Sequence, residues 1–311
     1  MKIVCLDAAT LGDADFSEFE KIGEFVKYDL SDKNDIINRL KDADVAMVNK
    51  IILDENILKN TNLKLILETA TGTNNIDMEY AKNNNIIVKN VAGYSTQSVA
   101  QHTFALVFSL LNNTIFFNQY CQNGKWCESK IFTCFDRVNE DLENKNWGII
   151  GLGTIGKQVA NIAKIFGANV SYYSTSGKND NKDFKNISLE ELLSTSDIIS
   201  IHAPLNDKTK NLIDEKELNL MKNKAIIINV GRGGIINEVA LAKAIDEKQI
   251  KAGIDVLEIE PMIKNHPFLN IKNKENLILS PHIAFASKES MQRLINKTLD
   301  NLKEFIKDHQ C

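Results

Sequence analysis

Short apolar runs of strand length alternate with helical patterns through the first third of the chain. Apolar residues fill the strand-length runs and recur every three or four positions in the segments between them. The predicted strands are 2–8, 24–29, 45–49, 63–70 and 86–91, and the predicted helices are 34–43, 53–60 and 77–85. Asn34 and Asp77 stand where helix N-caps are expected. Strands that are apolar throughout and joined by helices predict a parallel sheet covered on both faces.

The alternation resumes beyond an irregular segment in the middle of the chain. A long amphipathic run at 98–113 predicts a helix, and residues 124–145 show no regular pattern. Further predicted strands are 146–151, 168–174, 197–203, 225–230, 251–256 and 276–282, and the predicted helices are 153–167, 188–196, 214–222, 237–249 and 287–309. We therefore expect an α/β protein with two doubly wound parallel-sheet domains. The expected ligand site is a cleft between them, lined by turns that follow strands.

A glycine-rich turn, GLGTIG at 151–156, lies between a predicted strand and a predicted helix. In that context Gly151 permits a tight turn, Gly153 lets a pyrophosphate approach, and Gly156 allows close helix packing. The unpaired N–H groups at the start of the helix then bind the phosphates. A turn in which the glycines serve geometry alone is the alternative, but the flanking strand and helix favour a dinucleotide site.

The position that distinguishes NAD from NADP lacks the expected acidic residue. About 20 residues beyond such a glycine turn, a carboxylate usually binds the adenosine ribose hydroxyls. Here the chain has Ser174, Thr175 and Ser176, with Lys178 close behind. An acidic side chain would repel a 2′-phosphate, whereas hydroxyls bind either ribose and Lys178 can pair with a phosphate. The cofactor is therefore expected to be NAD(H) or NADP(H), with weak discrimination or a preference for NADPH.

Three residues with complementary chemistry follow successive predicted strands near the end of the chain. Arg232 lies in GRGG, Glu260 follows the strand that ends near Asp255, and His282 follows Pro281. Each alone has a structural explanation, as a surface cation, a solvated acid or a buried histidine. Together they fit one reaction: a guanidinium grips a carboxylate, and a histidine beside a carboxylate gives a proton to a carbonyl oxygen. With a nicotinamide as hydride donor, this is interconversion of a 2-oxo and a 2-hydroxy acid.

Composition and charge exclude several other classes. The 311 residues are 43% hydrophobic and carry a formal net charge of −4, without a long basic run. This argues against a nucleic-acid or membrane-surface protein, and we expect a cytoplasmic location. Cys121, Cys127 and Cys134 lack the close spacing of metal sites, so no metal is expected and reduced thiols are the preferred interpretation.

The motifs together resemble the D-isomer-specific 2-hydroxyacid dehydrogenases almost from end to end. They are ATGTNNID (70–77), YSTQSVAQHTFAL (94–106), WGIIGLGTIG (147–156), HAPLNDKTKNLI (202–213), NVGRGGIINEVAL (229–241), AGIDVLEIEP (252–261) and SPHIAFAS (280–287). The resemblance implies a Rossmann-type nucleotide domain at 98–283. It also implies a flavodoxin-like substrate domain made of 1–97 with 284–311.

The resemblance also assigns roles to individual residues. It implies that Arg232 binds the substrate carboxylate and carbonyl, that His282 is the acid/base, and that Glu260 holds and polarises His282. The implied cofactor-binding residues are Gly151, Gly153, Thr154, Ile155, Gly156, Ser174, Thr175, Lys178, His202, Pro204, Thr209, Val230, Asp255 and Thr96. The implied substrate-binding residues are Thr71, Gly72, Lys50 and Arg232.

Within the family, the sequences of the motifs are most like those of the glycerate dehydrogenase, or hydroxypyruvate reductase, branch. A broad glyoxylate or 2-oxo acid reductase remains an alternative. A D-lactate-type enzyme ranks lower because Ala286, not an aromatic residue, follows Phe285, and a formate dehydrogenase because Glu260 is not Gln. A nucleotide-sensing, corepressor-like binding protein is the alternative of another class. A homodimer is expected, with Trp126 and Phe132 in the segment that packs across it in related enzymes.

Overall fold

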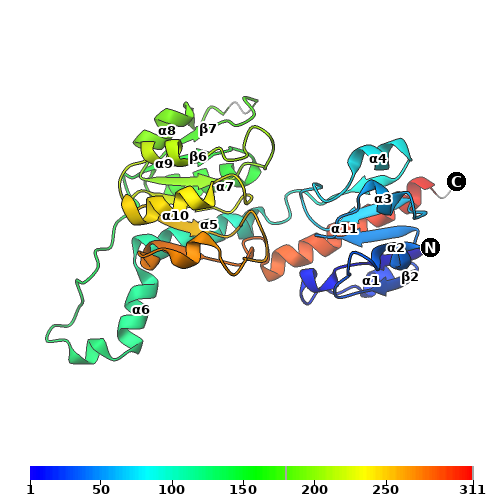
Figure 1. Ribbon diagram of the computed structural model, residues 1–311, viewed down its shortest axis with the longest axis horizontal. Coiled ribbons are helices and arrows are strands. Elements are labelled where there is room, and N and C mark those ends of the chain that lie inside the picture. The colour runs from blue at the N-terminus through cyan, green and yellow to red at the C-terminus, as the bar shows by residue number, and fades with distance from the viewer. Residues whose placement is uncertain (179–180, 310–311) are drawn as a thin grey trace. The chain divides into compact units, whose positions relative to one another are not determined.

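The computed structural model describes residues 1–178 and 181–309, which form two compact units (Figure 1). The first unit contains Met1–Ser95 together with the chain from Ala286 onward. The second unit is the continuous segment Thr96–Phe285. Each unit has its own parallel sheet and its own hydrophobic core.

The first unit is built on a five-stranded parallel sheet in the order β2-β1-β3-β4-β5. Its strands are β1 (Lys2–Cys5), β2 (Glu24–Lys27), β3 (Val45–Val48), β4 (Leu65–Glu68) and β5 (Ile87–Lys89). Every residue of β3 and β4 is buried, as expected for strands covered on both faces. All five strands lie within the ranges predicted from the sequence.

Helices cover this sheet. They are α1 (Ser17–Glu20), α2 (Ile36–Leu40), α3 (Glu55–Leu58), α4 (Met78–Asn83), α11 (Lys288–His309) and the 3-10 helix η1 (Ala8–Leu11). The Asp77 side chain accepts the Tyr80 N–H, which confirms the predicted cap of α4. The predicted cap at Asn34 is wrong, because α2 begins one residue later and its N-cap, Asp35, makes no side-chain cap bond. The one-turn helix α1 was not predicted, since a single turn shows no helical period.

The second unit contains a seven-stranded parallel sheet in the order β12-β11-β10-β9-β6-β7-β8. Its strands are β6 (Asn146–Ile150), β7 (Asn169–Tyr173), β8 (Lys185–Asn186), β9 (Ile198–Ile201), β10 (Ile226–Asn229), β11 (Lys251–Ile254) and β12 (Leu277–Leu279). The fold class is thereby confirmed, with two doubly wound parallel-sheet units. The two-residue edge strand β8 was not predicted, because both of its residues are polar and exposed.

Helices also cover the second sheet. They are α5 (Thr96–Leu111), α6 (Thr114–Gln122), α7 (Thr154–Ile165), α8 (Leu189–Thr195), α9 (Glu215–Leu220) and α10 (Glu238–Glu247), with the 3-10 helices η2 (Lys125–Glu128), η3 (Pro267–Asn270) and η4 (Lys274–Asn276). Helix α5 packs on α7, β10 and β11. In the core beneath it, Phe104 lies against the fully buried Trp147, whose indole N–H donates to Ser200 Oγ at 2.9 Å.

Helix α6 and the segment after it project from the rest of the second unit (Figure 1). No residue of α6 is buried, so its sequence lacks the apolar stripe of a helix that packs on a core. This helix was therefore not predicted.

The strand order determines where ligands can bind in the second unit. The order in which the chain adds strands reverses at β6: β7 and β8 lie on one side of it, and β9 to β12 lie on the other. In open parallel sheets this switch point, at the carboxyl ends of the strands, is where a crevice forms. The glycine turn follows β6, and His202 follows β9.

Candidate active site

The glycine turn has the geometry that a dinucleotide pyrophosphate requires. Gly151 has a φ of 90°, and a Cβ on Gly156 would meet the Gly151 carbonyl oxygen at 2.2 Å. A Cβ on Gly153 would meet nothing within 4 Å, so the space above this residue is open. Gly153 is the N-cap of α7 and makes no side-chain cap bond, which leaves the first N–H groups of the helix for a ligand. These residues fit the phosphates of a dinucleotide.

Two buried polar atoms near the switch point lack a partner among the described residues. They are Ser174 Oγ, directly after β7, and His202 Nδ1, directly after β9. Burial lowers the pKa of His202 to about 3, so its imidazole is neutral at physiological pH. Buried polar atoms are normally hydrogen-bonded, and a bound ligand would satisfy both of these. Thr175 is half-buried and Lys178 is exposed, beyond Ser174.

Thr209 shapes the loop after β9. It is fully buried, and its hydroxyl donates to the Pro204 carbonyl at 2.7 Å and accepts the Asn206 N–H at 2.8 Å. The hydroxyl is thus used within the loop, and the contact with the cofactor predicted for Thr209 stays a prediction. Val230, the residue after β10, is buried as well, and Thr96 is the first residue of α5.

Arg232 follows β10 in a loop that Asn229 holds at both ends. The Asn229 side chain accepts the Gly231 N–H at 3.1 Å and donates to the Arg232 carbonyl at 2.9 Å. Arg232 Nη1 donates to the Gly231 carbonyl at 2.8 Å. The half-buried guanidinium forms no ion pair within residues 1–178 and 181–309, so its other N–H groups remain for an anionic ligand.

His282 and Glu260 form a close pair in the second unit. His282 Nδ1 lies 2.6 Å from Glu260 Oε2, although the two residues come from different loops. The other ring nitrogen, Nε2, makes no hydrogen bond to the part of the chain that the structure describes. This arrangement suits a histidine that exchanges a proton at Nε2 while a carboxylate stabilises its charged form.

The buried Asp255 carboxylate holds the loop that carries His282. Its oxygens accept the Ser280 hydroxyl, the Ile283 N–H at 3.0 Å and the Ala284 N–H at 2.9 Å. The Asp255 carbonyl also accepts the His282 N–H at 2.8 Å. His282 has a φ of 54°, a conformation that costs a non-glycine residue about 1–3 kcal/mol. These bonds offset that cost, so Asp255 has a positioning role beyond the cofactor contact predicted for it.

Sequence reasoning missed the partners of Asp255. Ser280 Oγ also bonds His102 Nε2 at 2.8 Å, which links α5 to the His282 loop. Ser280 and His102 both lie inside motifs noted above, but a hydroxyl and an imidazole far apart in sequence gave no sign of their pairing.

In the first unit, Lys50 lies in a loop that Asp7 holds. The Asp7 carboxylate accepts the backbone N–H groups of Lys50 at 2.7 Å, Asn49 at 3.1 Å and Ile51 at 3.2 Å. Burial raises the pKa of Asp7, and these three hydrogen bonds oppose the rise.

The loop after β4 carries Thr71 and Gly72. The Thr71 hydroxyl donates to the Val91 carbonyl at 3.0 Å. The backbone N–H groups of Thr71 and Gly72 donate to no acceptor in the described ranges. They are therefore suited to bind an anionic ligand.

A second buried carboxyl group, that of Glu68, lies at the end of β4. Its Oε2 accepts Asn75 Nδ2 at 2.9 Å, while its Oε1 has no partner among the described residues. Burial raises the pKa of Glu68 to about 8; the nearby Asp7 adds to the rise and the Asn75 hydrogen bond opposes it. Glu68 is therefore protonated in the folded chain at neutral pH.

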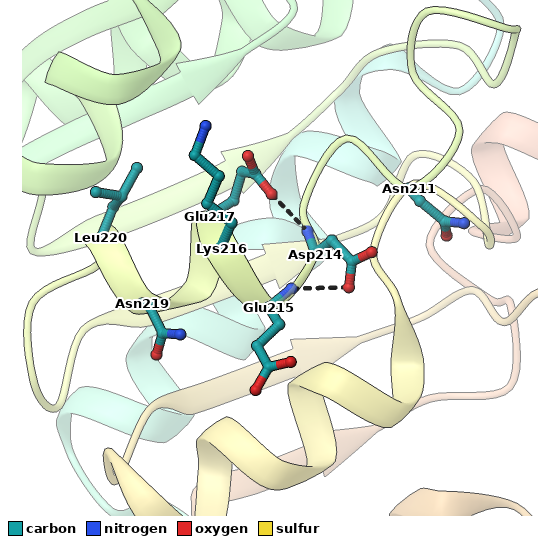
Figure 2. Close-up of a pocket in the computed structure, with 7 residues that line it drawn as sticks. All are labelled: Asn211, Asp214, Glu215, Lys216, Glu217, Asn219 and Leu220. Carbon is teal, nitrogen blue, oxygen red and sulfur yellow. Dashed lines mark hydrogen bonds between the residues drawn. The ribbon is translucent and has the colours of Figure 1, made fainter.

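Other surface features carry none of the predicted site residues. A hollow of about 890 Å³ lies over the start of α9, where Asp214 and Glu217 form a capping box (Figure 2). Its polar groups bond one another, as the dashed lines show. Within the described ranges, no group of three His, Cys, Asp or Glu residues could hold a metal, and no helix is long and apolar enough to cross a membrane. Cys311 lies outside the described residues.

Comparison with known proteins decides the family. The profile described as "D-isomer specific 2-hydroxyacid dehydrogenase, NAD binding domain" matches residues 104–284. The chain belongs to this family. It is therefore an oxidoreductase, and the residues around the glycine turn form its dinucleotide-binding domain.

Relatives within the family agree over most of the chain. A hydroxypyruvate reductase of Blautia hydrogenotrophica is 37% identical, over 99% of this chain and 97% of its own. A glycerate dehydrogenase of Methylorubrum extorquens is 37% identical, over 98% and 96%. A glyoxylate reductase of Aeropyrum pernix is 38% identical, over 78% and 73%. Among solved structures, an acyclic imino acid reductase in complex with NADPH and D-Arg is 29% identical, with a TM-score of 0.88 over 99% and 98%.

The Glu68 carboxyl group predicts a pH-dependent stability for the first unit. Because its pKa rises from 4.5 to about 8 on folding, the folded chain binds more protons than the unfolded chain between these values. The free energy of unfolding should therefore fall as pH rises through that window. Glu68→Gln keeps the neutral form, so its melting temperature relative to wild type should increase from pH 5 to about pH 8 and level off by pH 9.

Thermal unfolding of both proteins across that range measures the difference. Glu55→Gln, which alters an exposed carboxyl group of the same unit, is the control and should not change the slope. If the melting temperatures of Glu68→Gln and wild type changed in parallel with pH, the raised pKa of Glu68 would be contradicted.

Proposed function

We propose that the protein interconverts hydroxypyruvate and D-glycerate with a nicotinamide cofactor. The observation that carries this is the His282–Glu260 pair, 2.6 Å apart, on the same sheet edge as Arg232 and the glycine turn. The substrate follows from the relatives named hydroxypyruvate reductase and glycerate dehydrogenase. The chemistry follows from the residues.

Arg232 binds the substrate carboxylate with two parallel hydrogen bonds, which orients the adjacent carbonyl. The reduced nicotinamide, when bound, supplies a hydride to the carbonyl carbon. His282 Nε2–H gives its proton to the carbonyl oxygen, which becomes the hydroxyl of the product. Glu260 stabilises the protonated ring through Nδ1 and keeps it oriented. In the reverse reaction, neutral His282 takes the hydroxyl proton back.

We extend the same proposal to the roles of the two units. Residues 98–283 bind the dinucleotide, and 1–97 with 284–311 bind the substrate. In the first unit, the Thr71 and Gly72 amides and Lys50 contribute to holding the anionic substrate. The support for this is their position in loops that follow parallel strands, and the unpaired amides described above.

Steady-state kinetics with several 2-oxo acids and both cofactors test the proposed substrate. We expect the highest kcat/KM with hydroxypyruvate when it is compared with glyoxylate, pyruvate and phosphohydroxypyruvate, each with NADH and NADPH. D-glycerate should be the only enantiomer formed. Comparable values for glyoxylate would favour a broad 2-oxo acid reductase, and a preference for pyruvate a D-lactate-type enzyme. Cofactor binding without turnover of any substrate would favour a nucleotide-sensing, corepressor-like protein.

Arg232→Lys tests whether the Arg232 guanidinium binds the substrate carboxylate. An ammonium group cannot form the two parallel bonds of a guanidinium, so we expect kcat/KM for hydroxypyruvate to fall by roughly a hundredfold. The dissociation constant of NADH, measured by fluorescence titration, should stay within about twofold of wild type. Turnover near the wild-type value would contradict the assignment.

For the cofactor, we propose weak discrimination between NADH and NADPH, or a preference for NADPH. The support is the Ser174 hydroxyl after β7, which is buried and has no partner among the described residues, and the nearby Lys178, with no carboxylate among residues 174–178. Ser174→Asp adds a charge that repels a 2′-phosphate. The ratio of kcat/KM for NADPH to that for NADH should then fall at least about tenfold.

Asn169→Asp is the matched control, because it adds the same charge at the opposite end of β7. It should leave the cofactor ratio nearly unchanged. A wild-type enzyme that already prefers NADH by orders of magnitude would refute weak discrimination.

A homodimer and a cytoplasmic location complete the proposed function. In support of the dimer, the projecting segment after α6 exposes apolar side chains that a monomer would leave in water. They are Trp126, Ile131, Phe132, Phe135 and Val138, with Phe132 at 90% exposed. We expect light scattering to give twice the monomer mass, and Phe132→Ser with Phe135→Ser to shift the protein towards monomer. The control Ile165→Ser, which alters an exposed apolar residue on α7, should not shift the protein towards monomer. A monomeric wild type would contradict the proposal.

A further inference from the structure

We propose that Glu238 and His266 are positioning residues that set the place of Glu260. This inference rests on the proposed role of Glu260 beside His282. The loop from Leu257 to His266 carries Glu260 and connects β11 to η3. The sequence motifs gave neither Glu238 nor His266 a role.

One carboxylate spans the two ends of this loop. Glu238, the first residue of α10, accepts the Glu258 N–H at Oε1, at 2.7 Å. Its Oε2 lies 2.8 Å from His266 Nε2. The His266 side chain is 3% exposed and that of Glu238 is 14% exposed, so water does not readily replace the bond between them.

The hydrogen-bond pattern requires an acceptor at both Glu238 oxygens. The Phe268 N–H donates to His266 Nδ1 at 3.3 Å, so Nδ1 is an acceptor and Nε2 carries the ring proton. Both groups that face Glu238 are therefore N–H donors. A carboxylate accepts both, whereas an amide would direct its own N–H at one of them.

The bond to Glu258 lies two residues from Glu260. Glu260 Oε1 accepts the Leu257 N–H at 2.9 Å, and its Oε2 holds His282 Nδ1. The backbone here is tightly enclosed, because a Cβ on Gly233 would meet the Leu257 carbonyl oxygen at 1.9 Å. A shift of the loop at Glu258 would thus move the Glu260 carboxylate relative to the histidine. Misplacement of about 1 Å in a catalytic arrangement can cost roughly a hundredfold in rate.

A double-mutant cycle on kcat separates positioning from general destabilisation. We expect Glu238→Gln to lower kcat for hydroxypyruvate reduction about tenfold or more, with KM and NADH binding within about twofold of wild type. In the Glu260→Gln background, where the positioned carboxylate is gone, the same change should lower kcat by less than about twofold. Equal losses in both backgrounds would overturn the inference, as would wild-type kcat for Glu238→Gln.

His266 provides a second test that leaves α10 unchanged. Leu fills a similar volume but removes the donor to Glu238, whereas Gln retains an N–H donor. We expect His266→Leu to lower kcat and His266→Gln to recover part of the loss, again only when Glu260 is present. Equal kcat values for the two variants would overturn the inference.

Glu217→Gln is the matched control, because Glu217 also accepts a backbone N–H, that of Asp214, but in the capping box of α9. It should leave kcat unchanged. The proposed role of Glu260 beside His282 is tested separately by Glu260→Gln alone. Wild-type kcat for that variant would refute the role of Glu260 itself, whereas a large loss combined with additive effects of Glu238→Gln would refute only the positioning.

Discussion

The hydrogen bonds between Asp255 and the loop after β12 are the constraint on which the rest of the site depends. His282 adopts a left-handed backbone conformation, with φ at 54°, and such a residue persists only where its surroundings enforce it. A buried carboxylate that accepts the Ser280 hydroxyl and two backbone N–H groups provides that enforcement. The chain therefore folds so that His282, the proposed acid/base, is held before any ligand binds, and preorganisation of this kind lowers the barrier to reaction.

Buried ionisable groups are accommodated in two ways. In the second unit, the carboxylates of Asp255 and Glu238 accept hydrogen bonds, which offset the cost of burying them. In the first unit Glu68 has one oxygen without a partner in the described part of the chain, and burial keeps the group protonated instead. His202 is neutral for the same reason, since its ring is desolvated without an opposing charge.

Much of the fold, and the contact at the centre of the candidate site, could be predicted from the sequence. Continuously apolar strands predicted both parallel sheets, because strands buried on both faces admit few polar residues. The pairing of His282 with Glu260 follows from motifs that end neighbouring strands. Short or polar elements escaped prediction: α1 has one turn, β8 is exposed and polar, and α6 buries none of its residues. The Glu238–His266 and Ser280–His102 bonds also escaped, because they join residues far apart in sequence without a periodic pattern.

The central claim is that His282 delivers the proton to the substrate carbonyl. A single-turnover measurement with His282→Asn tests it most directly, by following oxidation of bound NADH after mixing with saturating hydroxypyruvate. We predict a rate at least about a hundredfold below that of wild type, with an unchanged dissociation constant for NADH. A single-turnover rate within about twofold of wild type would contradict the claim.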